Sequence, residues 1–310
     1  MSRRFPVPRR IISASRRSDI PAFYSRWFLR RLEAGFCDWV HPFTNRLHRV
    51  SLRADDCLAI VFWTRNPAPL FPALRDLHSA GYRYYFHMTV TGYPRPLESS
   101  TPALDVSLKR LRELADRTGP DSVIWRYDPI VISSRTPAAF HRAHFARIAR
   151  EIGGAVRGVY FSFVEPYGKT RRNFARLSAE HGIEFPEPGD REKRDLAAHL
   201  RDTAARFGVT LHACCEDWLV GDGIEKGRCV DLEIVRRLRS GVDEKLKKRP
   251  SRAQCGCTES VDIGAYDTCP FGCSYCYATR SRGLALARLR SHDVADTVLW
   301  RPPRLRGVMP

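Results

Sequence analysis

Short apolar runs alternate with longer amphipathic segments through the first 215 residues, and this alternation constrains the fold more than any other feature. Six runs are rich in residues that favour strands: 10–16, 58–64, 82–90, 122–128, 158–164 and 209–215. Between two of them, Leu104, Leu108, Leu111 and Leu114 follow helical spacing. A strand followed by a helix, repeated along the chain, predicts a parallel sheet with helices packed outside it.

A last strand-like run, 261-VDIGAY-266, lies near the end of the chain, and a helix-compatible segment, 284–291, follows it. With this unit the sequence predicts an α/β fold, a full or partial TIM-like (β/α) barrel. A doubly wound open sheet is the alternative, but no glycine-rich nucleotide-binding motif favours it. We expect three parts: barrel units in 1–216, a Cys-rich insertion in 217–260, and the final strand, loop and helix in 261–310.

The start of the chain, MSRRFPVPRR, is basic and lacks the apolar region of a signal peptide, and no run of about 18 apolar residues occurs. We therefore expect a cytoplasmic protein with no membrane contact. In such a protein ten cysteines indicate metal or redox chemistry rather than disulfides. The formal net charge of +18 suits a phosphate-bearing partner such as nucleic acid, although an arginine-rich composition alone also explains it.

The stretch 268-TCPFGCSYCYA-278 places Cys269, Cys273 and Cys276 in a C-x3-C-x2-C pattern. Three thiolates at this spacing can ligate three corners of a [4Fe-4S] cluster, and Gly272 lets the backbone wrap closely around it. The fourth iron then has no protein ligand and is open to a cofactor or substrate. A structural zinc site usually has paired C-x2-C units with four ligands, which this triplet fits poorly.

This loop resembles the signature loop of the radical S-adenosylmethionine (SAM) superfamily, including the aromatic residue before the last cysteine. The resemblance implies that the open iron binds the amine and carboxylate of S-adenosyl-L-methionine, whose reductive cleavage gives a 5′-deoxyadenosyl radical. It also implies that Cys269, Cys273 and Cys276 are the cluster ligands and that Tyr275 packs near the adenine.

More of the chain resembles an uncharacterised bacterial domain-of-unknown-function family, through 13-SASRRSDIPAFY-24, 63-WTRNP-67, 125-WRYDPI-130 and 262-DIGAYDTCPFGCSYCYA-278. Its members are distantly similar to spore photoproduct lyase, a radical SAM enzyme of DNA repair. The radical SAM loop usually follows the first barrel strand, whereas here it follows the last. A circular permutation would reconcile the two orders, and it predicts that 261-VDIGAY-266 lies beside 11-IISAS-15.

A second set of cysteines lies upstream of this loop: Cys214, Cys215, Cys229, Cys255 and Cys257. Four thiolates complete a closed metal site, and we favour Cys215, Cys229, Cys255 and Cys257 around a second [4Fe-4S] cluster. Zinc and unligated thiols are the alternatives. Cys37 and Cys57 are expected to pack as small apolar residues.

Polar residues follow the predicted strands, where the strand ends of a (β/α) barrel converge on its active site. They are Arg16, Arg17, Asp19, Thr64, Arg65, Asn66, His87, Thr89, Arg126, Asp128, Glu165 and Glu216. Together with Tyr275, we assign Arg16, Arg17, Asp19 and Glu165 to cofactor binding. The predicted catalytic residues are Arg65, Asn66, Arg126 and Asp128. Arginines can grip a carboxylate or phosphate, but a buried ion pair of Arg126 with Asp128 or Glu165 would only brace the barrel.

The leading hypothesis is therefore a radical SAM enzyme, whose unknown substrate is a nucleic acid or an anionic small molecule. It requires a one-electron reductant such as flavodoxin or ferredoxin. The alternative is a nucleic-acid-binding or repair-associated protein with structural iron–sulfur or zinc sites and no SAM chemistry.

Overall fold

A computed structural model describes residues 8–250, 252–305 and 307 of the 310-residue chain, and its centre is one eight-stranded sheet. The strands are β1 (Arg10–Ala14), β4 (Cys57–Thr64), β5 (Tyr84–Thr89), β6 (Val123–Arg126), β7 (Gly158–Phe161), β8 (Thr210–Ala213), β9 (Ile224–Lys226) and β10 (Val261–Asp262). Their order across the sheet is β10-β1-β4-β5-β6-β7-β8-β9, and every neighbouring pair is parallel. The predicted α/β fold with a parallel sheet is confirmed.

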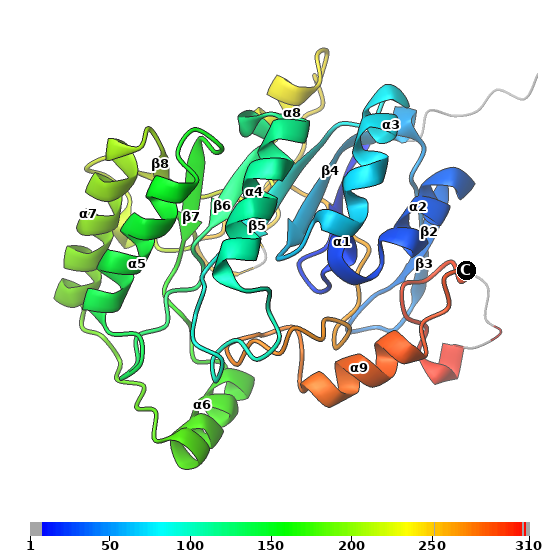
Figure 1. Ribbon diagram of the computed structural model, residues 1–310. Helices are drawn as coiled ribbons and strands as arrows, with labels where there is room; N and C mark the ends of the chain where they lie inside the picture. The colour runs from blue at the N-terminus through cyan, green and yellow to red at the C-terminus, as the bar shows by residue number, and fades with distance from the viewer. Residues whose placement is uncertain (1–7, 251, 306, 308–310) are drawn as a thin grey trace, which may run out of the picture.

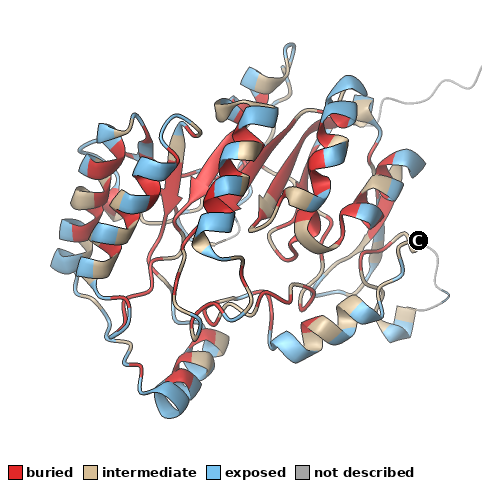
Figure 2. Cartoon of the chain, in the orientation of Figure 1, coloured by how far each residue is buried: buried red, intermediate tan, exposed pale blue. Residues whose placement is uncertain are grey.

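Helices cover one face of the sheet, as Figure 1 shows for the layer in front. They are α1 (Ile20–Phe23), α2 (Ser25–Ala34), α3 (Leu74–Ser79), α4 (Leu104–Thr118), α5 (Ala138–Glu151) and α7 (Asp190–Arg206). Helix α8 (Leu232–Leu238) packs on the opposite face, while α6 (Gly168–His181) and α9 (Arg282–Arg290) lie at the edge where the strands end. In α4 the predicted apolar stripe is buried at Leu108, Leu111 and Leu114. The buried residues form a continuous layer between sheet and helices (Figure 2). Within the described ranges no helix is long and apolar enough to span a membrane.

Side chains alternate between the two faces of each strand, so the sheet has a second buried face. Ile60 in β4 belongs to the helix-covered core, whereas its neighbour Val61 packs on the other face. There it meets Val230 and Val235 from the segment that follows β9. The cysteine-bearing part of the chain therefore covers the sheet face that the main helices leave open.

β10 pairs with β1 in parallel, with Val261 opposite Ile12 and Asp262 opposite Ser13. This confirms the predicted placement of 261–266 beside 11–15, although the strand itself spans only two residues. Among the described residues β9 and β10 do not pair, so the sheet is open and fits a partial TIM-like barrel.

Two features of the fold were not predicted. β2 (Phe36–Val40) and β3 (Leu47–Ser51) form a separate antiparallel hairpin between α2 and β4. β9 lies inside the expected insertion 217–260, yet it joins the main sheet beside β8. Its sequence, Ile-Glu-Lys, carries too short and too polar a pattern to signal a strand.

Candidate functional site

The C-x3-C-x2-C loop lies at the carboxyl edge of the sheet, directly after β10, between α6 and α9 (Figure 1). It is fixed to the loop that follows β5, since the Ser274 amide donates to the Leu97 carbonyl at 2.9 Å and the Ser100 amide donates to the Phe271 carbonyl at 3.0 Å. From α6, the Asn173 amide group donates to the Ser274 carbonyl at 2.7 Å. Two separate parts of the chain, the loop after β5 and helix α6, thus hold the loop in place.

Gly272 is required inside this loop for two reasons. Its φ of +71° lies in the left-handed region that favours glycine. A Cβ at this position would also come within 2.2 Å of the Ser99 hydroxyl oxygen. The backbone therefore approaches the neighbouring loop more closely than any side chain would allow.

The thiols of Cys269, Cys273 and Cys276 are partly exposed. Burial raises the pKa of Cys273 to about 12, although the nearby Arg65 guanidinium lowers it. Burial also raises the pKa of Cys269, and the proximity of Cys276 and Cys273 adds to this. Arg65 thus lies beside the cysteine loop, at the same edge of the sheet.

Arg65, at the end of β4, belongs to a buried network beneath the cysteine loop. Its guanidinium forms an ion pair with Glu98 at 2.9 Å and donates to the Thr91 hydroxyl at 3.2 Å. The Tyr275 hydroxyl contacts both Arg65 and Glu98. Tyr275 is part of the cysteine motif, so this network ties the strand end to the loop. Arg65 was predicted to be catalytic, and the structure shows it holding the loop.

Asp19 caps the short helix α1 and links it to the same strand end. Its carboxylate accepts from the Thr64 hydroxyl and the Arg65 amide, each at 2.7 Å, and from the Ala22 amide at 3.0 Å. Burial raises the pKa of Asp19 to about 6, against the opposing effect of these hydrogen bonds. Asp19 was predicted to bind the cofactor, and here it organises the strand end.

Asp262 organises the end of β1 in a similar way. Its carboxylate accepts from the Ser13 and Ser15 hydroxyls at 2.7 Å and from the Arg16 amide at 2.9 Å. It also pairs with Arg17 at 3.0 Å. Burial opposes ionisation, but Arg17 and these hydrogen bonds hold the pKa of Asp262 below its usual value. The predicted cofactor-binding residues Arg16 and Arg17 therefore share one carboxylate.

The second set of cysteines converges on the sheet face opposite the main helices. Each thiol hydrogen-bonds to the next around a ring: Cys214, Cys215, Cys255, Cys257 and Cys229. The Sγ atoms of Cys214 and Cys229 are 3.5 Å apart. Hydrogen bonds from Cys214 and Cys257 hold the pKa of Cys229 well below its usual value. The four predicted ligands thus lie together, and Cys214 joins them.

Arginines surround this second group. Arg126 donates to the Cys229 Sγ at 3.0 Å and also pairs with Asp128. Arg16 extends toward the same thiols, where Cys257 and Cys229 raise its pKa although burial lowers it. The structure therefore places Arg126 and Asp128, both predicted to be catalytic, in a bracing ion pair beside the second group.

Three other predicted residues lie apart from the first cysteine loop. Glu165 pairs with Arg252 at 2.9 Å, and Arg252 also donates to the Cys214 carbonyl at 3.3 Å, so Glu165 belongs to the second group. The Asn66 side chain accepts from the Ala68 amide at 3.2 Å and ends its strand. His87 is fully buried and bonds to the Cys229 carbonyl at 2.7 Å, while burial lowers its pKa to about 4.

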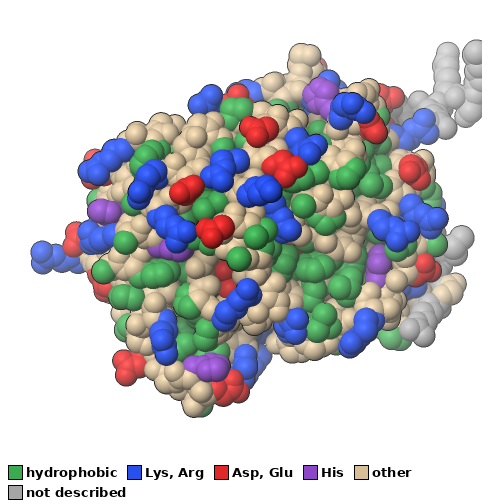
Figure 3. All heavy atoms as spheres, viewed as in Figure 1, with side chains coloured by type: hydrophobic (Ala, Val, Ile, Leu, Met, Phe, Trp, Pro, Cys, Tyr) green, Lys and Arg blue, Asp and Glu red, His purple; other side chains and the backbone are tan. Residues whose placement is uncertain are grey.

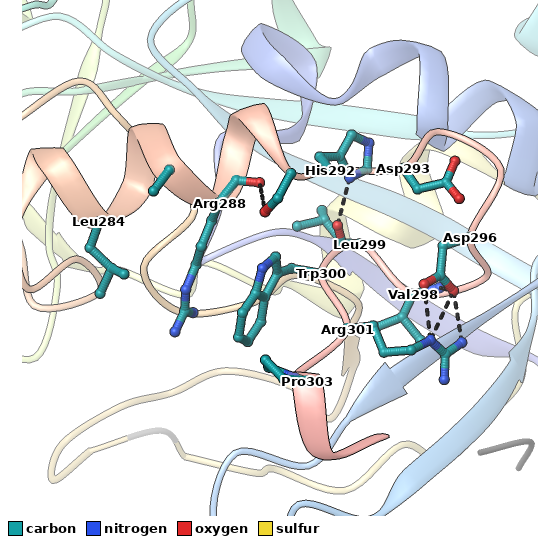
Figure 4. Close-up of a pocket in the computed structure, with 12 residues that line it drawn as sticks. Leu284, Arg288, His292, Asp293, Asp296, Val298, Leu299, Trp300, Arg301 and Pro303 are labelled. Atoms are coloured by element: carbon teal, nitrogen blue, oxygen red, sulfur yellow. Dashed lines mark hydrogen bonds and ion pairs between the residues drawn. The ribbon is translucent and has the colours of Figure 1, made fainter. Parts of the chain in front are cut away.

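A cavity of about 430 Å³ lies along α9, away from these groups (Figure 4). Arg288 stacks over the Trp300 ring at 3.6 Å, and Arg301 pairs with Asp296 at 2.7 Å. The His292 ring packs edge-on against Tyr24, whose hydroxyl donates to the Thr268 carbonyl at 2.7 Å. None of the cysteines lines this cavity. Tyr24, which packs against the cavity residue His292, contacts the cysteine loop, and the cysteines themselves lie outside the cavity.

Residues 11–278 match the family model described as a domain of unknown function, DUF1848. The chain belongs to the DUF1848 family. The match spans β1 to the end of the cysteine motif, so the DUF1848 domain includes the whole sheet and both cysteine groups. No curated protein matches this DUF1848 chain.

Glu98 and Asp262 are the polar residues at this edge that sequence reasoning did not select. Asp262 lies in the strand just before the motif, so its position in the sequence could have identified it as a site residue. Glu98 lies in an irregular loop between β5 and α4, where no periodicity marks it. Only the folded loop, which pairs Glu98 with Cys273, reveals its role.

Proposed function

We propose that this protein is a radical SAM enzyme that binds a [4Fe-4S] cluster through Cys269, Cys273 and Cys276. The observation that carries the proposal is the position of the three thiols. They lie on one loop at the carboxyl edge of a parallel sheet, after a strand that pairs with β1. In α/β barrels this edge carries the active site. A circularly permuted barrel predicts this pairing, so the resemblance of the motif and the topology agree.

The donor set fits such a cluster, because three thiolates from one loop leave one iron open. Within the residues that the structure describes, no group of three or more His, Cys, Asp or Glu side chains is arranged to hold a metal ion. Cluster binding therefore requires the thiols to converge, and coupling of metal binding to local folding is common. When bound and reduced, the cluster supplies the electron that cleaves SAM into methionine and a 5′-deoxyadenosyl radical.

This chain's own residues have supporting roles in the proposal. Arg65, Glu98 and Tyr275 hold the cysteine loop against the sheet. Arg16 and Arg17 follow β1: Arg17 pairs with Asp262, and the Arg16 side chain extends toward the second cysteine group, where it can bind an anionic group of a cofactor or substrate. The positive net charge of the chain favours an anionic substrate, either a nucleic acid or an anionic small molecule. The electron would come from a donor such as flavodoxin or ferredoxin.

We also propose that the second cysteine group binds a closed metal centre. Cys215, Cys229, Cys255 and Cys257 supply four thiolates, the complement of a second [4Fe-4S] cluster or of zinc. The proposal is supported by their convergence from three segments and by the arginines beside them, which offset the charge of thiolates.

Anaerobic reconstitution with iron and sulfide, followed by quantification of both, tests the proposal. We expect about four irons per chain if only the first group binds a cluster and about eight if both do. Protein that retains zinc and no acid-labile sulfide would contradict it. Salt-dependent DNA binding by protein that does not cleave SAM would favour the alternative of a binding protein with structural metal sites.

A further inference from the structure

We infer that the β2–β3 hairpin is a contact surface for unpaired nucleotides of a nucleic-acid strand. The hairpin forms its own two-stranded sheet beside α2, at one side of the molecule (Figure 1). It contains none of the thiols of the proposed function. Its one cysteine, Cys37, is buried in the core and belongs to neither cysteine group. The inference therefore goes beyond the proposed chemistry and stands or falls separately from it.

Net charge alone does not locate such a surface. Basic side chains are scattered over the face in Figure 3 and interspersed with acidic and apolar ones. A nucleic-acid strand that is bound without sequence readout needs a second component besides charge, namely exposed aromatic rings on which bases stack. Such a surface is therefore marked by solvent-exposed aromatic rings with arginines next to them.

Aromatic rings of this kind lie along the hairpin. Trp39 lies in β2, and His41 and Phe43 follow in the turn, where the His41 ring lies 6.0 Å from the Trp39 ring. His48 is the cross-strand partner of Trp39, and the two rings stack with centroids 4.9 Å apart and planes at 23°. The His41 ring lies 5.9 Å from Phe43 and 6.2 Å from His48. The rings form a series that runs from the stem to the tip.

The tip of this series is unusually exposed. The Phe43 side chain is 84% accessible, the highest value among the exposed large hydrophobic residues of the described chain. Scattered apolar residues on a surface need no explanation, but this ring contacts His41 edge-on and so continues the series of aromatic rings. Burial in a core does not account for Phe43, whereas stacking on a ligand does.

A cavity of about 290 Å³ lies against the stem of the same series. Trp39 and His48 line it, together with Arg10, Arg49 and Asp56. Ligand pockets usually measure ~300–1,000 Å³, so this cavity suits one ring of a ligand rather than a whole cofactor. Its walls combine a stacked aromatic pair with two guanidinium groups, the two components of single-strand binding sites.

The charge on the hairpin is of one sign at its surface. Arg46, Arg49 and Arg53 are exposed, and Asp38 is the one acidic residue between positions 36 and 53. Asp38 is fully buried and is bonded to Arg49 at 2.8 Å. A strand that stacks on the rings would place its phosphates near Arg46 and Arg53, whereas Arg49 is already paired with Asp38, and Asp55 and Asp56 follow the hairpin.

The neighbouring elements extend this basic surface. On α2, Arg26 and Arg30 lie one turn apart and are exposed, next to an exposed Glu33. On the other side, the Asp38 amide donates to the Thr297 carbonyl at 2.9 Å, which joins the hairpin to the C-terminal segment. Helix α2 thus adds two exposed arginines next to the hairpin.

Fluorescence anisotropy with labelled 20-nucleotide dT and rU strands, and with a duplex of equal length, tests the inference over a series of salt concentrations. We expect one of the single strands to bind more tightly than the duplex. Phe43→Ala should weaken this binding about tenfold, because one stacked base is lost. Arg46→Gln should weaken it and reduce the magnitude of the salt slope by about 0.7, the value for one phosphate of a single strand.

Two variants at the opposite end of the sheet serve as controls. Val220→Ala removes an apolar side chain that is 41% exposed, and Arg206→Gln removes an exposed charge from α7. Both should bind like the wild type, and circular dichroism should show that all four variants fold. Wild-type affinity of Phe43→Ala, equal affinity for duplex and single strand, or no binding at about 50 mM salt would overturn the inference.

Discussion

The two cysteine groups differ in how the fold builds them. The first consists of three partly exposed thiols on one ten-residue loop, held from below by the Arg65–Glu98 ion pair. The second gathers five thiols from three segments onto a buried sheet face, where they hydrogen-bond to one another. Nearness in sequence thus gathers the first three cysteines on one loop, whereas tertiary folding gathers the second five from separate segments.

This difference between the two groups predicts a reactive role for the first and a structural role for the second. A metal centre with an open position can bind and activate a small molecule, but a centre with four protein ligands is closed. If both groups bind clusters, only the cluster of the first group should cleave SAM. Variants in each group should therefore have different consequences.

The largest effect is expected from Cys273→Ala. With two ligands left, the loop should no longer hold its cluster, and about four irons should be lost per chain. Iron and sulfide analysis after anaerobic reconstitution measures this. Cys57→Ala is the matched control, since Cys57 is a buried core residue outside both groups. Equal iron content in the Cys273→Ala and Cys57→Ala proteins would show that Cys273 matters no more for iron binding than an ordinary core cysteine does.

Cys229→Ala should remove iron from the second group and leave SAM cleavage in place. The substitution also deprives the buried Arg126 of the partner at 3.0 Å, so we expect a loss of about 1–3 kcal/mol in the free energy of unfolding. Iron analysis, a SAM-cleavage assay and urea unfolding report on the three effects separately. Loss of SAM cleavage in a folded Cys229→Ala protein would show that the two groups act as one centre.

Much of this arrangement could be predicted from sequence, and the limit has a physical cause. The C-x3-C-x2-C spacing of the cysteine loop was visible in the sequence, and the resemblance to the radical SAM superfamily predicted that 261–266 lies beside 11–15. The set Cys215, Cys229, Cys255 and Cys257 was chosen from five upstream cysteines whose spacing is irregular. The ion pair of Arg126 with Asp128 was among the predictions, but the contacts of Arg65 with Glu98 and of Arg126 with Cys229 were not, because they form only through irregular loops. Ion pairs between distant segments leave no periodic pattern in a single sequence.

Glu98→Gln tests whether the first group depends on its buried support. The change leaves the Arg65 guanidinium in the interior without its counter-charge, which should cost about 3 kcal/mol of unfolding free energy. Urea unfolding of the metal-free protein measures it. In the control, Glu113→Gln breaks an exposed pair with Arg117 and should cost less than about 0.5 kcal/mol. Equal costs would mean that the network does not hold the loop.

Asp19→Asn should change the pH dependence of stability without loss of a proposed metal ligand. Because burial raises the pKa of Asp19 to about 6, above an unfolded value of about 3.9, the folded state binds the extra proton between these values. The Asp19 contribution should therefore fall by up to about 3 kcal/mol as pH rises from about 4 to above 6. Unfolding of both proteins at several pH values measures the difference. A constant difference between them would contradict the assignment.

Reductive cleavage of SAM is the most direct test of the central claim. Reconstituted wild-type protein, reduced under anaerobic conditions and supplied with SAM, should form 5′-deoxyadenosine and methionine in equal amounts. The Cys273→Ala protein should form neither, while Cys229→Ala should continue to form both. Wild-type protein that holds its iron and sulfide yet forms no 5′-deoxyadenosine, or a Cys273→Ala protein that forms as much as the wild type, would contradict the account.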